Sequence, residues 1–297
     1  MAEELLSGDI VITKNIGFKA PIVDAYSFRC LMDFIGATVV NFLIVVDPKT
    51  IHGSRSDINN TIFHNMIIDT DKLPDYFINP ELENVELCVN MRHFRSKIKN
   101  AQKRTNTLTL FNNIHNDYNF YAVIVVPNQK SNGTIIIDTV RVDERQEYEI
   151  DDYVDDDGEK LTPNLVLQVT DISRIFGHVS NSKCAYAEFI CYAKGILIKG
   201  FLDDKLTCIQ TLGHCINPLN VGEETARVKN GVEICRYKIP NVNIKPYQKI
   251  GNISPTNATL QIFYAKGKPL KISFPIGTSG THQTYLVDVD PNAMKTA

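Results

Sequence analysis

The chain has 297 residues, of which 43% are apolar and 22% are charged. This composition supports a sizeable folded core and excludes a disordered chain, and the length allows one large domain or two ordinary ones. The net charge of -3 excludes a protein that binds nucleic acid with its whole surface, so any basic surface is local. We expect no transmembrane helix and no signal peptide, because no apolar run is long enough. Seven scattered cysteines favour free thiols in a reducing, intracellular compartment.

Short helices and hairpins follow each other in the same order in both halves of the chain. In the first half, a helical pattern over 24–36 precedes a predicted hairpin over 42–53. In the second half, a helical pattern over 171–180 precedes a hairpin over 189–200. Each hairpin has two apolar runs around a tight turn and ends at a glycine.

A second helix follows in each half and leads into another strand. The helices are predicted over 90–103 and 242–250, and the strands include 107–110 and 259–262. A repeat of about half the chain is too long for a solenoid unit. We therefore predict an α+β fold of two similar domains with many short strands and few helices.

Acidic residues are concentrated near the middle of the chain. The segment 143–159 is rich in aspartate and glutamate, whereas 87–116 contains neither. A self-repelling acidic stretch is typical of an extended linker. This places the predicted boundaries at an N-terminal extension (1–17), a first domain (18–142), a linker (143–163) and a second domain (164–297).

The helix predicted from residue 91 has two unlike faces. Met91, Phe94 and Ile98 form one apolar stripe, and cations fall on the far side. The plain alternative is a solvated charged face, but such faces usually interleave acids with their bases. The other helices carry fewer cations, which matter only if the fold gathers all four helices on one surface.

Other motifs do not support chemistry. The run 155–158 resembles part of a calcium loop, but Tyr153 and Asn164 stand where that loop requires carboxylates. The cysteines lack zinc spacing, and no nucleophile, base and acid form a recognisable set. We therefore expect no metal, no cofactor and no enzymatic activity.

The order of these segments resembles a sliding clamp of the proliferating cell nuclear antigen (PCNA) type, as a divergent viral member. The segments that carry the resemblance are 18–35, 89–91, 172–175, 268–274 and 284–287. The resemblance implies two domains of the DNA-clamp fold, with outer antiparallel sheets and four helices on the inner face. It also implies a ring of three identical subunits around duplex DNA.

The resemblance implies two kinds of binding site. Cations on the matching helices would contact DNA: Arg29, Arg92, Arg95, Lys99, Lys103, Arg174, His178, Lys183, Lys245 and Lys249. A groove beside the linker would receive a partner peptide with apolar and aromatic anchors, and its matching residues are Ser54, Ile62, Leu161, Pro163, Pro269, Tyr285, Leu286 and Val287. The loop 53–60 is polar, which departs from the family pattern.

The partners implied are double-stranded DNA, a DNA polymerase, other replication and repair proteins with a clamp-binding motif, and a clamp loader. The implied location is the nucleus or a viral replication compartment. Strands over 134–142 and 205–212 are the candidates for the seams between subunits. Three alternatives remain: a processivity factor of this fold that does not close a ring, an enzyme acting on nucleic acid, and a structural virion protein.

Overall fold

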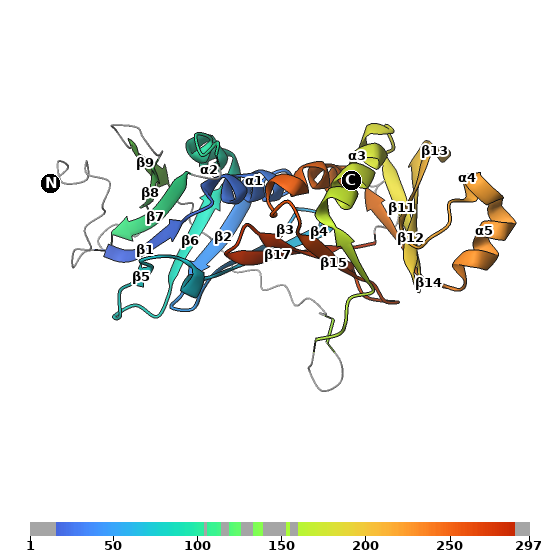
Figure 1. Cartoon of the computed structure of the whole chain (residues 1–297). Helices are drawn as coiled ribbons and strands as arrows, with labels where there is room; N and C mark the ends of the chain where they lie inside the picture. Colours follow the sequence, from blue (N-terminus) through green and yellow to red (C-terminus); the bar gives the residue numbers. More distant parts are fainter. Residues whose placement is uncertain are drawn as a thin grey trace.

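The structure, a computed structural model, describes residues 16–103, 106–113, 119–125, 133–138, 153–154 and 160–288. The molecule is elongated: three sheets follow one another in a row, and helices run along one side of them (Figure 1). Within the described residues, no helix is both long and apolar enough to cross a membrane.

The first half of the chain contributes two helices and the strands of one end of the molecule. Helix α1 begins after Asp24, whose carboxylate accepts a hydrogen bond from Ser27 N at 3.0 Å, and it ends at Gly36. Asn90 caps α2 in the same way, through His93 N at 3.2 Å. The bounds are β1 Ile16–Ile22, α1 Ala25–Ile35, β2 Asn41–Val46, β3 Thr50–Ser56, β4 Ile62–Asp69, η2 Thr70–Lys72, β5 Phe77–Ile78, β6 Val85–Asn90, α2 Met91–Ile98, β7 Thr107–Asn113, β8 Asn119–Val125 and β9 Gly133–Asp138.

The second half repeats the order of the main helices and strands, with α4 and α5 where the first half has η2 and β5. Its last helical segment is one α turn (α6) followed by a 3-10 segment (η3), and Pro246 near the start of η3 cannot donate a backbone hydrogen bond. The bounds are β10 Leu165–Gln168, α3 Val169–Asn181, β11 Tyr186–Tyr192, β12 Gly195–Leu202, β13 Lys205–Gly213, α4 Pro218–Val221, α5 Glu223–Asn230, β14 Glu233–Pro240, α6 Asn241–Ile244, η3 Lys245–Asn252, β15 Thr259–Phe263, β16 Leu270–Ile276 and β17 Gly280–Leu286.

The central sheet takes strands from both halves. Its order is β10-β15-β16-β17-β4-β3-β2-β6, and the antiparallel pair β17–β4 joins the second half to the first. The end sheets have the orders β5-β1-β7-β8-β9 and β13-β12-β11-β14. At the junction, His64 Nδ1 lies 3.1 Å from His282 Nε2, and both side chains are fully buried.

One hydrophobic core runs between the helices and the sheets and crosses from one half to the other. Aromatic edges mark this continuity: the ring of Tyr247 lies 5.0 Å from Phe34 on α1 and 5.1 Å from Phe176 on α3. Phe28 on α1 meets Phe94 on α2 at 6.3 Å. The four helical segments therefore share one core, because the burial of these aromatic rings stabilises the contacts between the segments.

The predicted helices and hairpins are confirmed, with three corrections. The helix predicted over 242–250 is one α turn followed by a 3-10 segment. Helix α2 ends at Ile98 rather than near residue 103. The excursion between β13 and β14 forms α4 and α5, which the sequence patterns did not predict. It lies beside an apolar patch that includes Ile190, Tyr192 and Leu197 on the end sheet. The division into two domains stays a prediction, and most of the predicted linker 143–163 lies outside the described residues.

Candidate functional sites: a basic helical face and an apolar groove

Four helical segments lie side by side on one side of the molecule (Figure 1). Across this side the order is α2, α1, η3 and α3, and each segment packs directly against the next. Ser27 Oγ of α1 donates to the carbonyl of Asn252 at 3.3 Å, and the Ser173 hydroxyl of α3 donates to the carbonyl of Gln248. We call the surface made by α1, α2, α3 and α6–η3 the helical face. It gathers cations that the sequence spreads over four distant segments.

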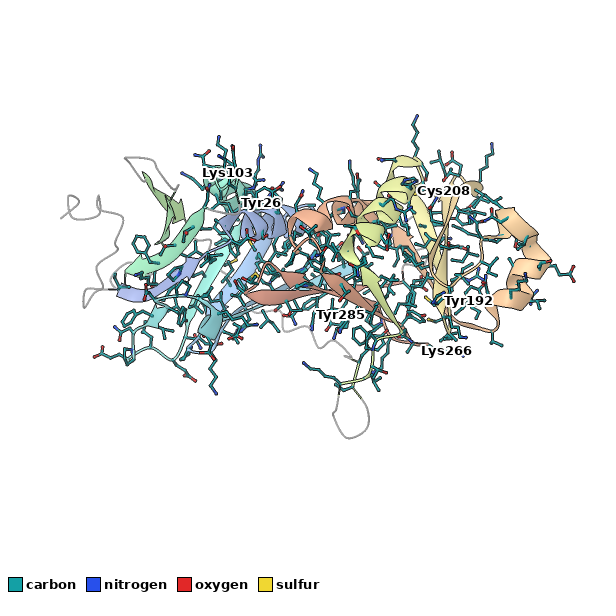
Figure 2. The ribbon with its side chains drawn as sticks, in the orientation of Figure 1. Tyr26, Lys103, Tyr192, Cys208, Lys266 and Tyr285 are labelled. Carbon is teal, nitrogen blue, oxygen red and sulfur yellow. The ribbon has the colours of Figure 1, made fainter. Side chains whose placement is uncertain are left out.

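The helical face is strongly basic. Its four segments contain only two acidic residues, Asp33 and Asp171, and each pairs with an arginine, at 2.7 and 3.5 Å. Lys97, which the sequence prediction left out, is also exposed on α2. Figure 2 shows Lys103 on this side of the molecule. The exposed cations and histidine of the predicted set are Arg92, Lys99, Lys103, Arg174, His178, Lys183, Lys245 and Lys249.

Two predicted arginines are instead held within the helical layer. Arg95 donates from Nε to Asp33 Oδ1 at 2.7 Å and from Nη1 to the Gly36 carbonyl at 3.0 Å. Arg29 donates from Nη1 to the Lys99 carbonyl at 3.1 Å, and its guanidinium lies 5.0 Å from the centre of the Tyr26 ring. Both side chains tie α1 to α2, so they position the basic surface rather than extend it.

A groove of about 620 Å³ opens on the other side of the molecule. It lies between β14, β17 and the turn that joins β15 to β16, and its wall includes Phe63, Tyr237, Lys266, Pro269, Tyr285 and Val287. Figure 2 shows Tyr285 and Lys266 on the side away from Lys103 and Tyr26. The wall is largely apolar and aromatic, and charged side chains stand among it. Such a surface suits an apolar anchor with polar flanks.

Strand alternation decides which predicted groove residues reach it. Along β17, Tyr285 lines the groove, whereas its neighbour Leu286 is fully buried in the core. On β4, Ile62 is likewise in the core, and Phe63 lines the groove with its ring 6.0 Å from that of Tyr285. The sequence prediction stopped at Ile62. The period-two pattern of β4 was the signal that could have identified Phe63.

Tyr153, in the middle of the predicted linker, contacts the wall of the groove. Tyr153 donates its hydroxyl to the carbonyl of Pro269 at 2.6 Å, and its ring lies 5.5 Å from that of Phe263. Burial raises the pKa of the Tyr153 hydroxyl, which keeps it a hydrogen-bond donor. Three other predicted groove residues, Ser54, Leu161 and Pro163, are not among the residues that line the groove.

The described part of the chain contains no group of three or more histidine, cysteine, aspartate or glutamate side chains placed to hold a metal ion. The acidic run 155–158, which resembles part of a calcium loop in the sequence, lies outside the described residues.

No protein-family profile and no curated protein match this sequence. Solved structures do match it in fold. The PCNA2–PCNA3 complex from Sulfolobus tokodaii has a TM-score of 0.69 at 12% identity, over 91% of this chain and 98% of that one. The proliferating cellular nuclear antigen from Entamoeba histolytica has a TM-score of 0.69 at 14% identity, over 93% and 100%.

The chain therefore has the fold of the PCNA-type sliding clamps, which confirms the predicted α+β class and the resemblance at the level of fold. The predicted viral origin stays a prediction.

Proposed function

We propose that the chain is a sliding clamp, a non-enzymatic processivity factor that encircles duplex DNA. The observation that carries this proposal is the helical face, where exposed cations lie on or just after α2, α3 and η3, and where the only two acids of its four segments are both paired with arginine. Lysine and arginine attract phosphates without reading base edges. Binding is then nearly uniform along the duplex, so the barrier to each sliding step is small.

The internal repeat supports closure into a ring. The orders β4-β3-β2-β6 and β13-β12-β11-β14 correspond strand for strand, and so do β1-β7-β8-β9 and β10-β15-β16-β17. In the middle of the molecule, β4 pairs with β17. Within the described residues, their counterparts β13 and β9 are edge strands of the two end sheets. Pairing β13 of one copy with β9 of the next would repeat the central junction between subunits.

Three copies form the proposed ring. The Sulfolobus tokodaii structure is a complex of PCNA2 with PCNA3, so chains of this fold associate with each other. Edge strand β13 also carries Leu206, which is 48% exposed, next to Leu202, which is 41% exposed. An unpaired edge with exposed leucines is prone to aggregate, and a subunit seam would cover it.

The groove gives the proposed clamp its partners. An aromatic or aliphatic side chain of a peptide would lie against Tyr285, Pro269 and Val287. A DNA polymerase and other replication and repair proteins would dock through such peptides, in the nucleus or a viral replication compartment. The groove and the helical face lie on different sides, so a docked protein would not compete with DNA.

The assembly is tested by mass and by topology. In solution, the 33.4 kDa chain should have close to three times that mass. On DNA anchored at one end, a ring threads over the free end and is retained in high salt only if that end is then blocked. Loss despite the block would contradict encirclement. A mass of one or two chains with salt-sensitive binding would instead favour the processivity factor that does not close a ring.

A further inference from the structure

Two cysteines face each other across neighbouring strands beside the groove. Cys191 on β11 lies directly opposite Cys235 on β14 in the antiparallel register. Directly opposite residues have Cα atoms about 4.5–5.5 Å apart, within the span of about 4.4–6.8 Å that a disulfide bridges. Both are free thiols. The strands therefore already hold the two sulfur-bearing side chains in a position to be joined.

The two thiols differ in access. Cys191 is fully buried in the core, whereas Cys235 is half-buried and lines the groove. A small reagent that enters the groove therefore meets Cys235 first. Cys235 also has a second polar neighbour, because its Sγ lies 3.4 Å from the hydroxyl oxygen of Tyr237.

The surroundings favour the thiolate at Cys235. The contacts with Cys191 and with Tyr237 lower the pKa of the Cys235 thiol, against the opposing effects of burial and of the Glu233 charge. The same bond to Cys235, together with burial, raises the pKa of Cys191. Burial raises the pKa of two other half-buried thiols, Cys88 and Cys215. The thiolate is the reactive form of cysteine, so the most reactive thiol of these four is the one in the groove.

We propose that Cys235 and Cys191 form a peroxide-sensitive dithiol site, in which the groove thiol reacts first and the buried thiol closes a disulfide. The Cys235 thiolate attacks one oxygen of hydrogen peroxide: an S–O bond forms, the O–O bond breaks and hydroxide leaves. The Cys191 sulfur then attacks the sulfenic sulfur, the S–O bond breaks, and the departing hydroxide takes the Cys191 proton. Two thiols lose two electrons, and one peroxide becomes two waters.

The disulfide would change one wall of the groove. The Tyr237 hydroxyl donates to the Ala265 carbonyl at 3.0 Å and accepts from Ala265 N at 3.3 Å. It thereby holds the start of the turn 265–269, which lines the groove. A Cys235 sulfur drawn toward Cys191 loses its hydrogen bond to Tyr237. This effect on peptide docking rests on the proposed function, whereas formation of the disulfide does not.

The disulfide is tested on the unaltered full chain. Brief alkylation with iodoacetamide at neutral pH should label Cys235 before Cys88 and Cys215. The chain is then treated with equimolar hydrogen peroxide, blocked with N-ethylmaleimide and digested. Mass spectrometry should detect a disulfide-linked pair of peptides, one with Cys191 and the other with Cys235. Equal labelling of all three thiols, or peroxide treatment without this linked pair, would overturn the proposal.

Two variants assign the roles. In Cys191→Ala, peroxide should leave a sulfenic acid at Cys235 that dimedone traps, with no linked pair. Cys88→Ser is the matched control at a half-buried thiol and should form the linked pair as the unaltered chain does. Linkage of Cys235 to a different cysteine in Cys191→Ala, at the rate of the original reaction, would contradict the assigned pairing.

The consequence for docking is measured with a fluorescent synthetic peptide that carries apolar and aromatic anchors. Oxidation should weaken its binding to the unaltered chain at least tenfold, and dithiothreitol should restore it. If the disulfide forms but the peptide binds equally, control of the groove is overturned. If the peptide fails to bind even the reduced chain, the proposed groove function fails, while the disulfide result stands independently.

Discussion

The junction in the middle of the molecule and the two edges at its ends are built from equivalent strands, yet their surfaces differ. At the junction, β4 is paired on both sides and alternates regularly between core and surface. Its counterpart β13 is paired on one side only, and residues at its start, including Leu206, are exposed. The strand at this position of the repeat is thus paired on both sides where the chain supplies its own partner strand, and on one side where it does not.

This difference indicates what a second copy would contribute. The junction buries a polar pair, His64 and His282, together with aromatic rings such as Phe34. Backbone pairing, buried apolar area and the hydrogen bond between the histidines all act within one chain there. At the ends, pairing has to come from another molecule, so it depends on concentration and can be broken without unfolding the chain.

The largest effect should come from the seam. Leu206→Glu places a charge on the free edge of β13, and burying that charge against a neighbouring copy is costly. We expect the mass in solution to fall from three chains to one, with the free energy of unfolding of the single chain changed by less than about 0.5 kcal/mol. Light scattering and denaturant unfolding measure the two quantities.

Val166→Glu is the matched control for the seam. Val166 is 55% exposed on β10, which is also an edge strand but belongs to the central sheet. The assembly should survive this change. If both variants dissociate alike, β13 has no special part in assembly.

Charge reversal on the helical face should have the next largest effect. Arg92→Glu, Lys99→Glu and Lys103→Glu together should reduce the dependence of log K on log salt by roughly 0.9 for each phosphate that the variant no longer neutralises. Titration of DNA at several salt concentrations measures this slope. Lys49→Glu, Lys72→Glu and Lys229→Glu make the same change of charge outside the helical face. An equal fall in slope for both sets would show that only net charge matters.

The groove should show a smaller and more selective effect. Val287→Glu puts a carboxylate on the apolar wall of the groove. We expect peptide affinity to fall at least tenfold, or about 1.4 kcal/mol, because the bound apolar anchor would remove water from this charge. Binding to DNA should not change. Ile67→Glu introduces the same charge at an exposed position of β4 outside the groove. Parallel losses of peptide and DNA binding would argue against a separate docking site.

The remaining prediction concerns the junction itself, where the free energy of unfolding should depend on pH. Burial lowers the pKa of His64 from 6.5 to about 3. Burial, and repulsion from His64 whenever that ring is protonated, lower the pKa of His282 as well. Below about pH 6.5 the unfolded chain therefore binds protons at these two histidines that the folded chain does not. Stability is therefore full well above pH 6.5 and falls as the pH drops below that value, with a limiting slope of about 1.4 kcal/mol per pH unit for each histidine that stays unprotonated in the folded chain.

Denaturant unfolding between pH 7 and 5 measures this slope. His282→Gln keeps a polar side chain at the junction but removes one titrating group, so its slope should be shallower by about 1.4 kcal/mol per pH unit. His178→Gln on the exposed surface of α3 is the control and should keep the original slope. Identical slopes for the unaltered protein and both variants would exclude the junction histidines as the cause of the pH dependence.

Local signals predicted most of the elements. Asp24 and Gly36 bound α1 at the residues that the sequence indicated, because a cap depends on side chains within one turn. The apolar stripe of Met91, Phe94 and Ile98 is buried as its spacing predicts. These interactions involve residues three or four positions apart, so the local sequence specifies them without any contact to a distant segment.

Other features depended on packing between segments that are remote in the chain. His64 and His282 are 218 residues apart, and only the pairing of β4 with β17 places them together. The division of neighbours such as Ile62 and Phe63 between core and groove follows from which side of a strand the helices cover. Spacing along the chain determined the helices, the hairpins and the segregation of charge. Packing determined the common helical face, the groove wall and the opposed cysteines. Each of these features brings together side chains that are far apart in the sequence, so no local sequence pattern predicts that they are close in space.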